Sequence, residues 1–179
     1  MVDFRRKRHR LSPQSYRGRR AHFVTLCTAG RQKVFVDPVL TTAIVKVLGK
    51  TCMDHAFGVY AYCFMPDHVH LILTGEDDSS DLPAAVRALK GASAVAARKI
   101  GLCPLWQKGF YDHVLRSTES MDAAAWYVFM NPVRAGLARR VEDWAHSGSF
   151  VFDWKRPEPW GQPFKPPWKA IEAKAQAAS

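Results

Sequence analysis

Two histidines one residue apart lie in the apolar stretch PDHVHLIL, from Pro66 to Leu73. Side chains alternate between the two faces of a β-strand, so His68 and His70 would project from one face and Val69 from the other. Two imidazoles on one face are the beginning of a metal site, and they are equally compatible with two solvated or packed histidines. The pair alone does not decide between a ligand role and a structural role.

A tyrosine and an asparagine later in the chain add chemistry that this pair lacks. Tyr127 and Asn131 are four residues apart in a helical stretch, so they share a helix face with Cβ atoms about 5–6 Å apart. A tyrosine beside a metal site is a candidate nucleophile, because a phenolate can attack phosphorus and later leave. An amide oxygen can complete a coordination sphere begun by two imidazoles, and that set suits Mg²⁺ or Mn²⁺. Alternatively, Tyr127 is a core residue and Asn131 caps a helix that begins at Pro132.

Other residues compete with these candidates or would support them. Tyr111 and His113 in YDHV share one strand face, which makes Tyr111 a rival nucleophile and His113 a further candidate ligand. Packing against aromatic neighbours explains a strand tyrosine equally well. Asp67, in the turn before the histidine pair, would orient the imidazoles from behind, although a turn aspartate needs no such role.

The chain is strongly basic, with a net charge of +10 at pH 7 over 179 residues and a pI near 9.7. Such a charge favours a polyanionic partner, most often nucleic acid, with an anionic membrane surface as the alternative. The first 20 residues hold eight Lys or Arg residues against one Asp. We interpret residues 1–20 as a basic arm that contacts DNA, with a disordered tail as the alternative. Tyr16 in this arm is a candidate for stacking on an exposed base.

The order of predicted elements indicates an α+β fold. It is a ferredoxin-like split βαβ layout, with one antiparallel sheet, helices on one face and an added C-terminal helix that bears Tyr127. Asp37 and Asp81 are placed to cap the first two helices. We predict strands over 22–28, 57–65, 68–75 and 110–115, and helices over 39–50, 82–101, 119–130 and 133–141.

We expect three regions: the arm over 1–20, a catalytic domain over 21–150 and a tail over 151–179 that is rich in Pro, Trp and Lys. The composition of this tail predicts that it is extended or disordered. Its tryptophans suggest that it docks on the domain or on nucleic acid. The basic start is followed by LSPQSYRGRR rather than by an apolar segment, so we expect no secretory signal and no membrane span. Four scattered cysteines fit reduced thiols in a cytoplasmic, nucleoid-associated protein.

Four motifs in this order resemble the HUH endonuclease superfamily. MPDHVHLIL looks like its His-hydrophobic-His signature, and WYVFMNPVRAGL is similar to the helix that carries the single tyrosine of its transposase branch. YRGRRAHFVTLCTAGRQKVF and LWQKGFYDHVLRS extend the likeness over about residues 10–140. The nearest group is the REP-associated tyrosine transposases, which are relatives of the small insertion-sequence transposases.

The resemblance implies a metal-dependent enzyme that cuts and rejoins single-stranded DNA folded into a hairpin, such as REP-like elements. Tyr127 would be the nucleophile and would form a 5′-phosphotyrosine link, while His68, His70 and Asn131 would hold one Mg²⁺ or Mn²⁺ ion. The protein would act as a monomer or a homodimer. The residues expected to bind DNA are Tyr16, Arg17, Arg19, Arg20 and Lys90.

Two alternatives to this enzyme remain open. One is a non-catalytic, domesticated nucleic-acid-binding protein that keeps these residues without turnover. The other is a zinc hydrolase that uses only the histidine pair and is indifferent to Tyr127.

Overall fold

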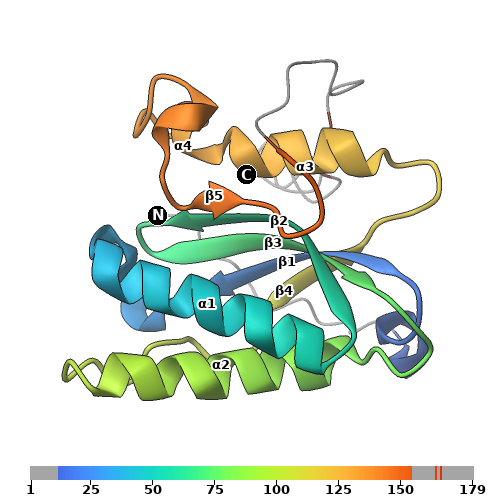
Figure 1. Cartoon of the computed structure of the whole chain (residues 1–179), viewed down its shortest axis with the longest axis horizontal. Coiled ribbons are helices and arrows are strands. Elements are labelled where there is room, and N and C mark those ends of the chain that lie inside the picture. Colours follow the sequence, from blue (N-terminus) through green and yellow to red (C-terminus); the bar gives the residue numbers. More distant parts are fainter. Residues whose placement is uncertain (1–11, 155–163, 165, 167–179) are drawn as a thin grey trace, which may run out of the picture.

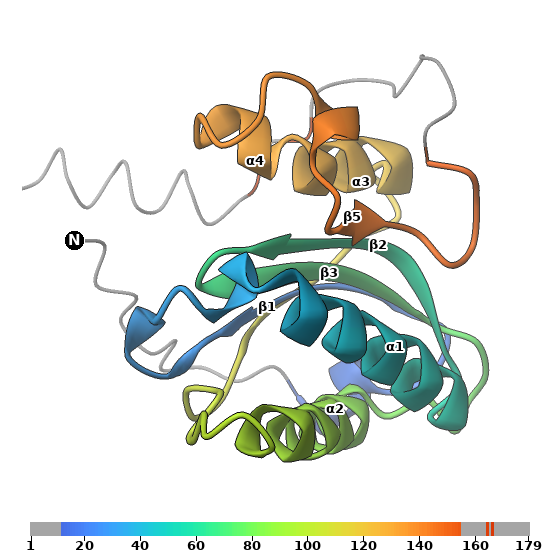
Figure 2. The same cartoon turned by 60° about the vertical axis from the view of Figure 1, so that its left-hand side comes forward.

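The computed structural model describes residues 12–154 together with Phe164 and Pro166. The strands are β1 (Ala21–Cys27), β2 (Phe57–Met65), β3 (His68–Gly75), β4 (Tyr111–Val114) and β5 (Ser147–Gly148). The helices are α1 (Pro38–Asp54), α2 (Leu82–Arg98), α3 (Met121–Phe129) and α4 (Asn131–Arg134). The strands form one antiparallel sheet in the order β4-β1-β3-β2-β5. Helices α1 and α2 cover one face of this sheet and α3 covers the other (Figure 1, Figure 2).

This arrangement confirms the predicted α+β class and the ferredoxin-like order of elements. Both long helices begin at the predicted caps, because their first turn leaves backbone N–H groups without helical partners. Asp37 accepts hydrogen bonds from the N–H groups of Val39 and Leu40 at 2.8 and 3.2 Å. Asp81 accepts one from Ala84 at 3.1 Å. The cap and the following proline together set where each helix starts.

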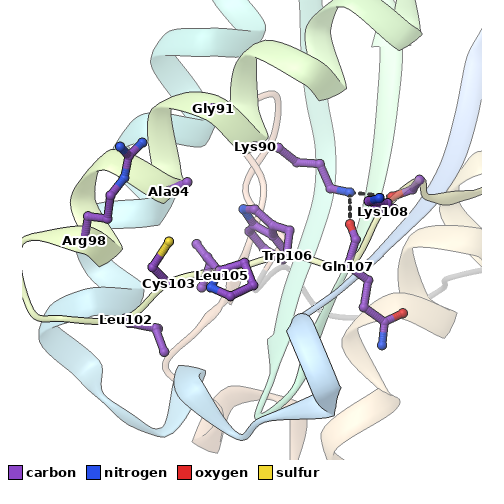
Figure 3. Close-up of a pocket in the computed structure, with 12 residues that line it drawn as sticks. Lys90, Gly91, Ala94, Arg98, Leu102, Cys103, Leu105, Trp106, Gln107 and Lys108 are labelled. Carbon is purple, nitrogen blue, oxygen red and sulfur yellow. Dashed lines mark hydrogen bonds between the residues drawn. The ribbon is translucent and has the colours of Figure 1, made fainter.

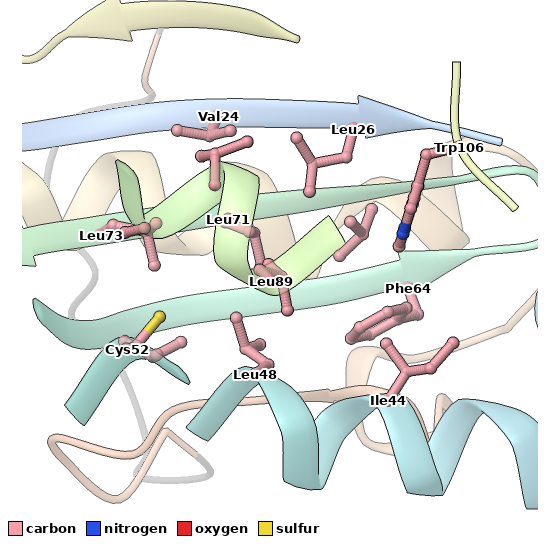
Figure 4. Close-up of a cluster of buried hydrophobic side chains, with 14 of the residues drawn as sticks. Val24, Leu26, Ile44, Leu48, Cys52, Phe64, Leu71, Leu73, Leu89 and Trp106 are labelled. Atoms are coloured by element: carbon pink, nitrogen blue, oxygen red, sulfur yellow. The ribbon is translucent and has the colours of Figure 1, made fainter. Parts of the chain in front are cut away.

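The larger core lies between the sheet and the pair α1 and α2 (Figure 4). Alternate residues of β1 and β3 point into it, since successive strand residues face opposite sides. Burying each side chain of this size stabilises the fold by about 1.5–3 kcal/mol. The residues that meet here include Val24, Leu26, Leu71 and Leu73 from the sheet and Ile44, Leu48 and Leu89 from the helices.

A second cluster lies between the sheet and α3, and an irregularity in β2 helps to hold that helix. The register of β2 against β3 shifts between Val59 and Ala61. Tyr60 and Ala61 consequently both pack in the cluster beneath α3. The Tyr60 hydroxyl donates a hydrogen bond of 2.5 Å to the carboxylate of Asp122 in the first turn of α3. A bulge of this kind re-aims a side chain, and here it directs a tyrosine at the helix.

The C-terminal part differs from the prediction in two places. The sequence predicts a helix over 133–141, but α4 ends at Arg134, and Gly136 adopts a left-handed backbone with φ of 68°. Glycine accepts this conformation without strain, and it commonly ends a helix. The two-residue β5, which pairs with Tyr62 and Cys63, was not predicted because it is too short to show a periodic pattern.

Parts of the predicted arm and tail belong to the domain. Phe152, Trp154 and Phe164 pack against the cluster beneath α3. Residues 1–11 and most of the tail beyond Trp154 lie outside the described residues. All four cysteines are free thiols, as expected. No helix in the described part of the chain combines the length and the apolar character needed to cross a membrane.

The hydrogen bond between Tyr60 and Asp122 predicts a measurable contribution to stability. Replacing Tyr60 with Phe should lower the free energy of unfolding by about 1–2 kcal/mol, because a part-buried carboxylate loses a strong donor. Urea denaturation of the variant checks this value. Tyr62→Phe is the matched control, because its hydroxyl makes no hydrogen bond within the described residues. Equal losses in the two variants would contradict the assignment.

His22 predicts how stability depends on pH. It is fully buried, and neither ring nitrogen has a hydrogen-bond partner within the described residues. Burial, together with the nearby Arg20, lowers its pKa from 6.5 to about 4. Below pH 6.5 the unfolded chain therefore binds this proton more readily than the folded chain. The free energy of unfolding should fall by up to about 3 kcal/mol as the pH drops from 6.5 to 4.

The variant His22→Leu should show a weaker fall over the same pH range, because it has no imidazole to protonate. Urea denaturation at several pH values compares the two proteins. An unchanged pH dependence in His22→Leu would mean that other groups produce the effect.

Candidate functional site

His68 and His70 lie on the face of the sheet that α3 covers. In the register, His70 is opposite Thr25 of β1 and His68 is opposite Cys27. Between the two histidines, Val69 points to the other face and packs in the core with α1 and α2. The alternation predicted from the sequence is therefore present, and both imidazoles are on the same side of the sheet as Tyr127.

The two imidazoles form a continuous chain of hydrogen bonds. His68 Nδ1 lies 2.6 Å from the Asp67 carboxylate, His68 Nε2 lies 3.0 Å from His70 Nε2, and His70 Nδ1 lies 2.9 Å from Thr25 Oγ1. The carboxylate can only accept, so His68 Nδ1 carries a proton. Burial lowers the pKa of His68, although Asp67 opposes that shift. A neutral His68 then has an Nε2 lone pair, which accepts from His70 Nε2 in the His70 tautomer that carries its proton there.

The distance between the two Nε2 atoms fits a shared divalent cation. Adjacent nitrogen ligands at about 2.1 Å from an octahedral ion are separated by about 3.0 Å, which matches the 3.0 Å between the rings. The outer nitrogens are already held by a carboxylate and a hydroxyl, as is usual for histidine ligands. Within the described residues, no third His, Cys, Asp or Glu completes a cluster with this pair.

Asp67 is itself held by Arg31, a residue that the sequence analysis did not single out. Arg31 Nε lies 3.0 Å from Asp67 Oδ2, and Arg31 Nη1 donates to Cys27 Sγ at 3.0 Å. The backbone of Arg31 is left-handed, with φ of 57°, which is unfavourable for a residue with a Cβ. This turn brings a guanidinium beside Asp67, so both carboxylate oxygens are engaged.

Tyr127 lies on α3, and the ring of Phe23 lies close to both Tyr127 and His70. The centroid of the Phe23 ring is 5.6 Å from that of His70 and 6.1 Å from that of Tyr127. Phe164 packs against the rings of both Phe23 and Tyr127, with its centroid 6.3 Å and 5.7 Å from theirs. The predicted nucleophile and the predicted ligands thus belong to one cluster of side chains beneath α3.

Arg134 is a second functional candidate that the sequence analysis missed. Its guanidinium carbon lies 4.0 Å from the centre of the Tyr127 ring, and its Nη2 donates to the Tyr127 carbonyl at 2.7 Å. Burial lowers the pKa of Arg134, and Tyr127 opposes this shift. Guanidinium groups stay charged in proteins, so a fixed positive charge faces the phenol ring. Its spacing of seven residues from Tyr127, two helical turns, was the one signal available in the sequence.

Asn131 holds the junction between α3 and α4. Its amide nitrogen donates to the carbonyls of Tyr127 and Val128 at 3.2 and 3.1 Å, and its oxygen accepts from Arg134 at 2.9 Å. The capping alternative is wrong, because Met130 occupies the N-cap and Asn131 is the first residue of α4. Metal ligation by Asn131 stays a prediction that needs its oxygen to exchange Arg134 for an ion.

The rival candidates on β4 have their own surroundings. Tyr111 is opposite Thr25, so it shares the face and the row of His70. His113 Nε2 lies 3.0 Å from both carboxylate oxygens of Glu119, so this nitrogen is already hydrogen-bonded to a carboxylate. Tyr111 therefore remains close enough to the site to serve as a control for Tyr127.

The residues predicted to bind DNA divide into three groups. The expectation for Tyr16 is corrected, because its ring is 7% exposed and packs in the core beside His22, where it cannot stack on a base. Arg17 pairs with Asp81 at 3.2 Å but remains largely exposed, and Arg19 and Arg20 are also exposed. Lys90 donates to the Gln107 and Gly109 carbonyls, so its ammonium group fixes a loop.

Comparisons with known proteins agree with the motifs. A family model described as "Transposase IS200 like" matches residues 15–128, which include both histidines and Tyr127 but not Asn131. A REP-associated tyrosine transposase of Escherichia coli (strain K12) is 30% identical over 124 residues, covering 65% of this chain and 71% of that protein. A solved structure of a REP-associated tyrosine transposase bound to a REP hairpin has a TM-score of 0.63 and 22% identity. It covers 89% of this chain and 98% of that chain, and this likeness is one of fold.

Proposed function

Because this chain belongs to the family of IS200-like transposases, we propose that it cuts and rejoins single-stranded DNA through a covalent bond to Tyr127. The observation that carries the proposal is the shared cluster beneath α3. There, the ring of Phe23 contacts both the imidazole of His70 and the ring of Tyr127. His70 Nε2 in turn lies 3.0 Å from His68 Nε2. One chain therefore carries both a candidate cation site and a candidate nucleophile.

In the proposed reaction, Tyr127 Oη attacks the phosphorus of a phosphodiester. The phenol loses its proton as the new O–P bond forms, the bond from phosphorus to the 3′ oxygen breaks, and that oxygen takes up a proton. The products are a free 3′-OH and a 5′-phosphotyrosine. Each step exchanges one phosphodiester for another, so a 3′-OH can reverse the reaction and rejoin strands without ATP.

Arg134 supplies the charge that this nucleophile needs. A guanidinium carbon 4.0 Å from the centre of the ring puts a positive charge beside the nucleophile, where it can pair with a phosphate oxygen. A DNA phosphate that binds Arg134 would draw it away from Asn131 and free the amide oxygen. Asn131 would then hold the junction between α3 and α4 in the free protein and bind an ion once DNA is bound.

His68 and His70, with Asn131 as the proposed third ligand, would hold one Mg²⁺ or Mn²⁺ ion. The donor set of two imidazoles and an amide oxygen leaves positions for water and phosphate oxygens. When bound, the ion would act as a Lewis acid on the scissile phosphate. Asp67 and Thr25 orient the imidazoles by bonding to their outer nitrogens.

The proposed substrate is a single strand that folds into a hairpin. The related structure is of a protein bound to a REP hairpin, and a net charge of +10 favours a polyanion here too. Three exposed arginines lie in the segment just before β1, where they can contact phosphates: Arg17, Arg19 and Arg20. We propose a DNA-binding role for these three arginines and withdraw it for Tyr16.

The first test is covalent capture of DNA. A hairpin-bearing single strand labelled at its 3′ end should give a slow protein–DNA band on a denaturing gel in the presence of Mg²⁺ or Mn²⁺. A strand labelled at its 5′ end should give a shorter fragment that ends in a 3′-OH, because the protein is bound to the other product. The Tyr127→Phe variant should lose the band by at least 1000-fold.

The control for this test is Tyr111→Phe, which removes a phenol from the same face of the sheet and should retain the band. A band that survives in Tyr127→Phe would refute the nucleophile assignment. Cleavage without any covalent band would favour the zinc hydrolase. Retardation on a native gel, with neither cleavage nor a band, would favour the non-catalytic binding protein.

A second prediction concerns Asp67, which holds His68. Replacing Asp67 with Ala should weaken Mn²⁺ binding by about 10–100-fold, because His68 loses the partner that orients its ring. Isothermal calorimetry with MnCl₂ measures this affinity without any DNA. The exposed Asp78→Ala variant is the control for the loss of one negative charge. Equal affinities in the wild-type and Asp67→Ala proteins would rule out this role of the carboxylate.

A further inference from the structure

A groove of about 450 Å³ lies between α2 and residues 102–109, apart from the cluster beneath α3 (Figure 3). Its walls are mainly apolar and include Ala94, Leu105 and the indole of Trp106. Two exposed cations, Arg98 and Lys108, also line it. A site of this size with apolar walls and a few charged groups is suited to a small planar ligand that carries negative charge.

The walls of the groove are fixed by hydrogen bonds. Trp106 Nε1 donates to Ser93 Oγ of α2 at 2.8 Å, which sets the plane of the indole. Lys90 Nζ donates to the carbonyls of Gln107, at 2.6 Å, and Gly109, which ties the loop to the same helix (Figure 3). The groove is thus preformed, and an occupant would not have to order it.

Gly91 lines the groove at a position with open space around it. It lies in the middle of α2 with an ordinary helical backbone, and a Cβ added there would meet nothing within 4 Å. Glycine is the least favoured residue in a helix interior apart from proline. A larger side chain at this position would therefore extend along the groove without displacing a neighbour, which makes Gly91 a suitable place to fill the groove.

The charge around the groove is of one sign. Residues 82–111 contain five Lys or Arg residues and no Asp or Glu. Three of the five cations, Lys90, Arg98 and Lys108, line the groove itself. This complementarity favours an anionic occupant.

The groove also adjoins the end of the sheet that carries His68. Gln107 N donates to the Cys27 carbonyl at 2.9 Å, and Cys27 is the residue opposite His68 in the register. The loop that forms one wall of the groove therefore extends the sheet beside β1.

We propose that this groove binds one unpaired nucleotide of single-stranded DNA, which rests on the proposed function. The base packs against the more accessible apolar residues of the groove, Ala94, Leu102 and Pro104, which lie over the buried Leu105 and Trp106. Arg98 and Lys108 pair with the flanking phosphates. Every base has an apolar face, so the site would grip a strand with little sequence preference.

The test is binding of labelled DNA by the full chain, followed by fluorescence anisotropy in EDTA so that no cleavage occurs. Gly91→Leu places a side chain in the groove and should weaken binding to a hairpin with a single-stranded overhang by about tenfold. Its thermal midpoint should not fall, because leucine is a better helix former than glycine. Ala92→Leu, at an exposed position of the same helix outside the groove, should bind like the wild type.

A blunt hairpin without an overhang separates the unpaired base from the duplex backbone. Gly91→Leu should bind this blunt hairpin as the wild type does. Equal weakening on both DNAs would show that the groove contacts duplex phosphates, and no weakening on either would show that it binds no DNA; each result overturns the proposal.

The charge assignment has its own matched pair of variants. Arg98→Gln should lower the slope of log affinity against log salt by about 0.7 for the overhang DNA, as expected for one lost phosphate contact. Lys99→Gln removes the same charge from the next, exposed residue outside the groove and should leave the slope unchanged. Equal changes in the two slopes would indicate non-specific attraction and overturn the assignment.

Failure of this inference is distinguishable from failure of the proposed function. Normal covalent capture by Tyr127 together with normal binding in Gly91→Leu would refute the groove alone. A wild-type protein that binds no DNA at all would refute both.

Discussion

β3 pairs along its length with β1 on one side and β2 on the other, and this double pairing fixes the face on which each of its side chains lies. A slip of one residue would turn His68 and His70 into the core beneath α1 and α2 and expose Val69. The apolar residues of β3 oppose that slip, because Val69, Leu71 and Leu73 are all buried. The packing of one face therefore positions the polar groups of the other.

The two faces of the sheet carry different kinds of side chain. The face beneath α1 and α2 holds the larger apolar core, whereas the face beneath α3 carries the histidine pair and Tyr127. With nine residues, α3 is too short to be stable as an isolated helix. Its position depends on the Ser120 cap, the bond from Tyr60 to Asp122, and the contacts of Arg134 at its C-terminal end. The place of Tyr127 is consequently set by tertiary contacts more than by helix propensity.

Local rules were enough to predict most of the elements and the common face of the two histidines. Strand alternation put His68 and His70 on one face, and Asp37 and Asp81 marked the starts of two helices. The class of fold followed from the order of these elements. The family match covers both histidines and Tyr127, as the motifs indicated.

The residues that were missed depend on geometry between distant segments. Thr25 reaches His70 only through the register of two strands 45 residues apart. Arg31 reaches Asp67 only because a left-handed turn points it there. Tyr16 stands in a basic segment that looks like a solvated arm, yet its ring is large enough to fill the end of the core. Charge patterns along the sequence do not report such burial.

The hydroxyl of Thr25 affects which ring nitrogen of His70 can carry the proton. A hydroxyl can donate or accept, so the same 2.9 Å contact is compatible with either neutral tautomer of His70. With a proton on Nε2, His70 donates to His68; with the proton on Nδ1, it donates to Thr25 and presents a second lone pair beside that of His68. The net charge of the pair is the same in both arrangements. When His70 loses the proton on Nε2 and gains one on Nδ1, rotation of the Thr25 hydroxyl keeps the outer hydrogen bond, so the two tautomers differ only in whether the inner nitrogens share a proton or present two lone pairs.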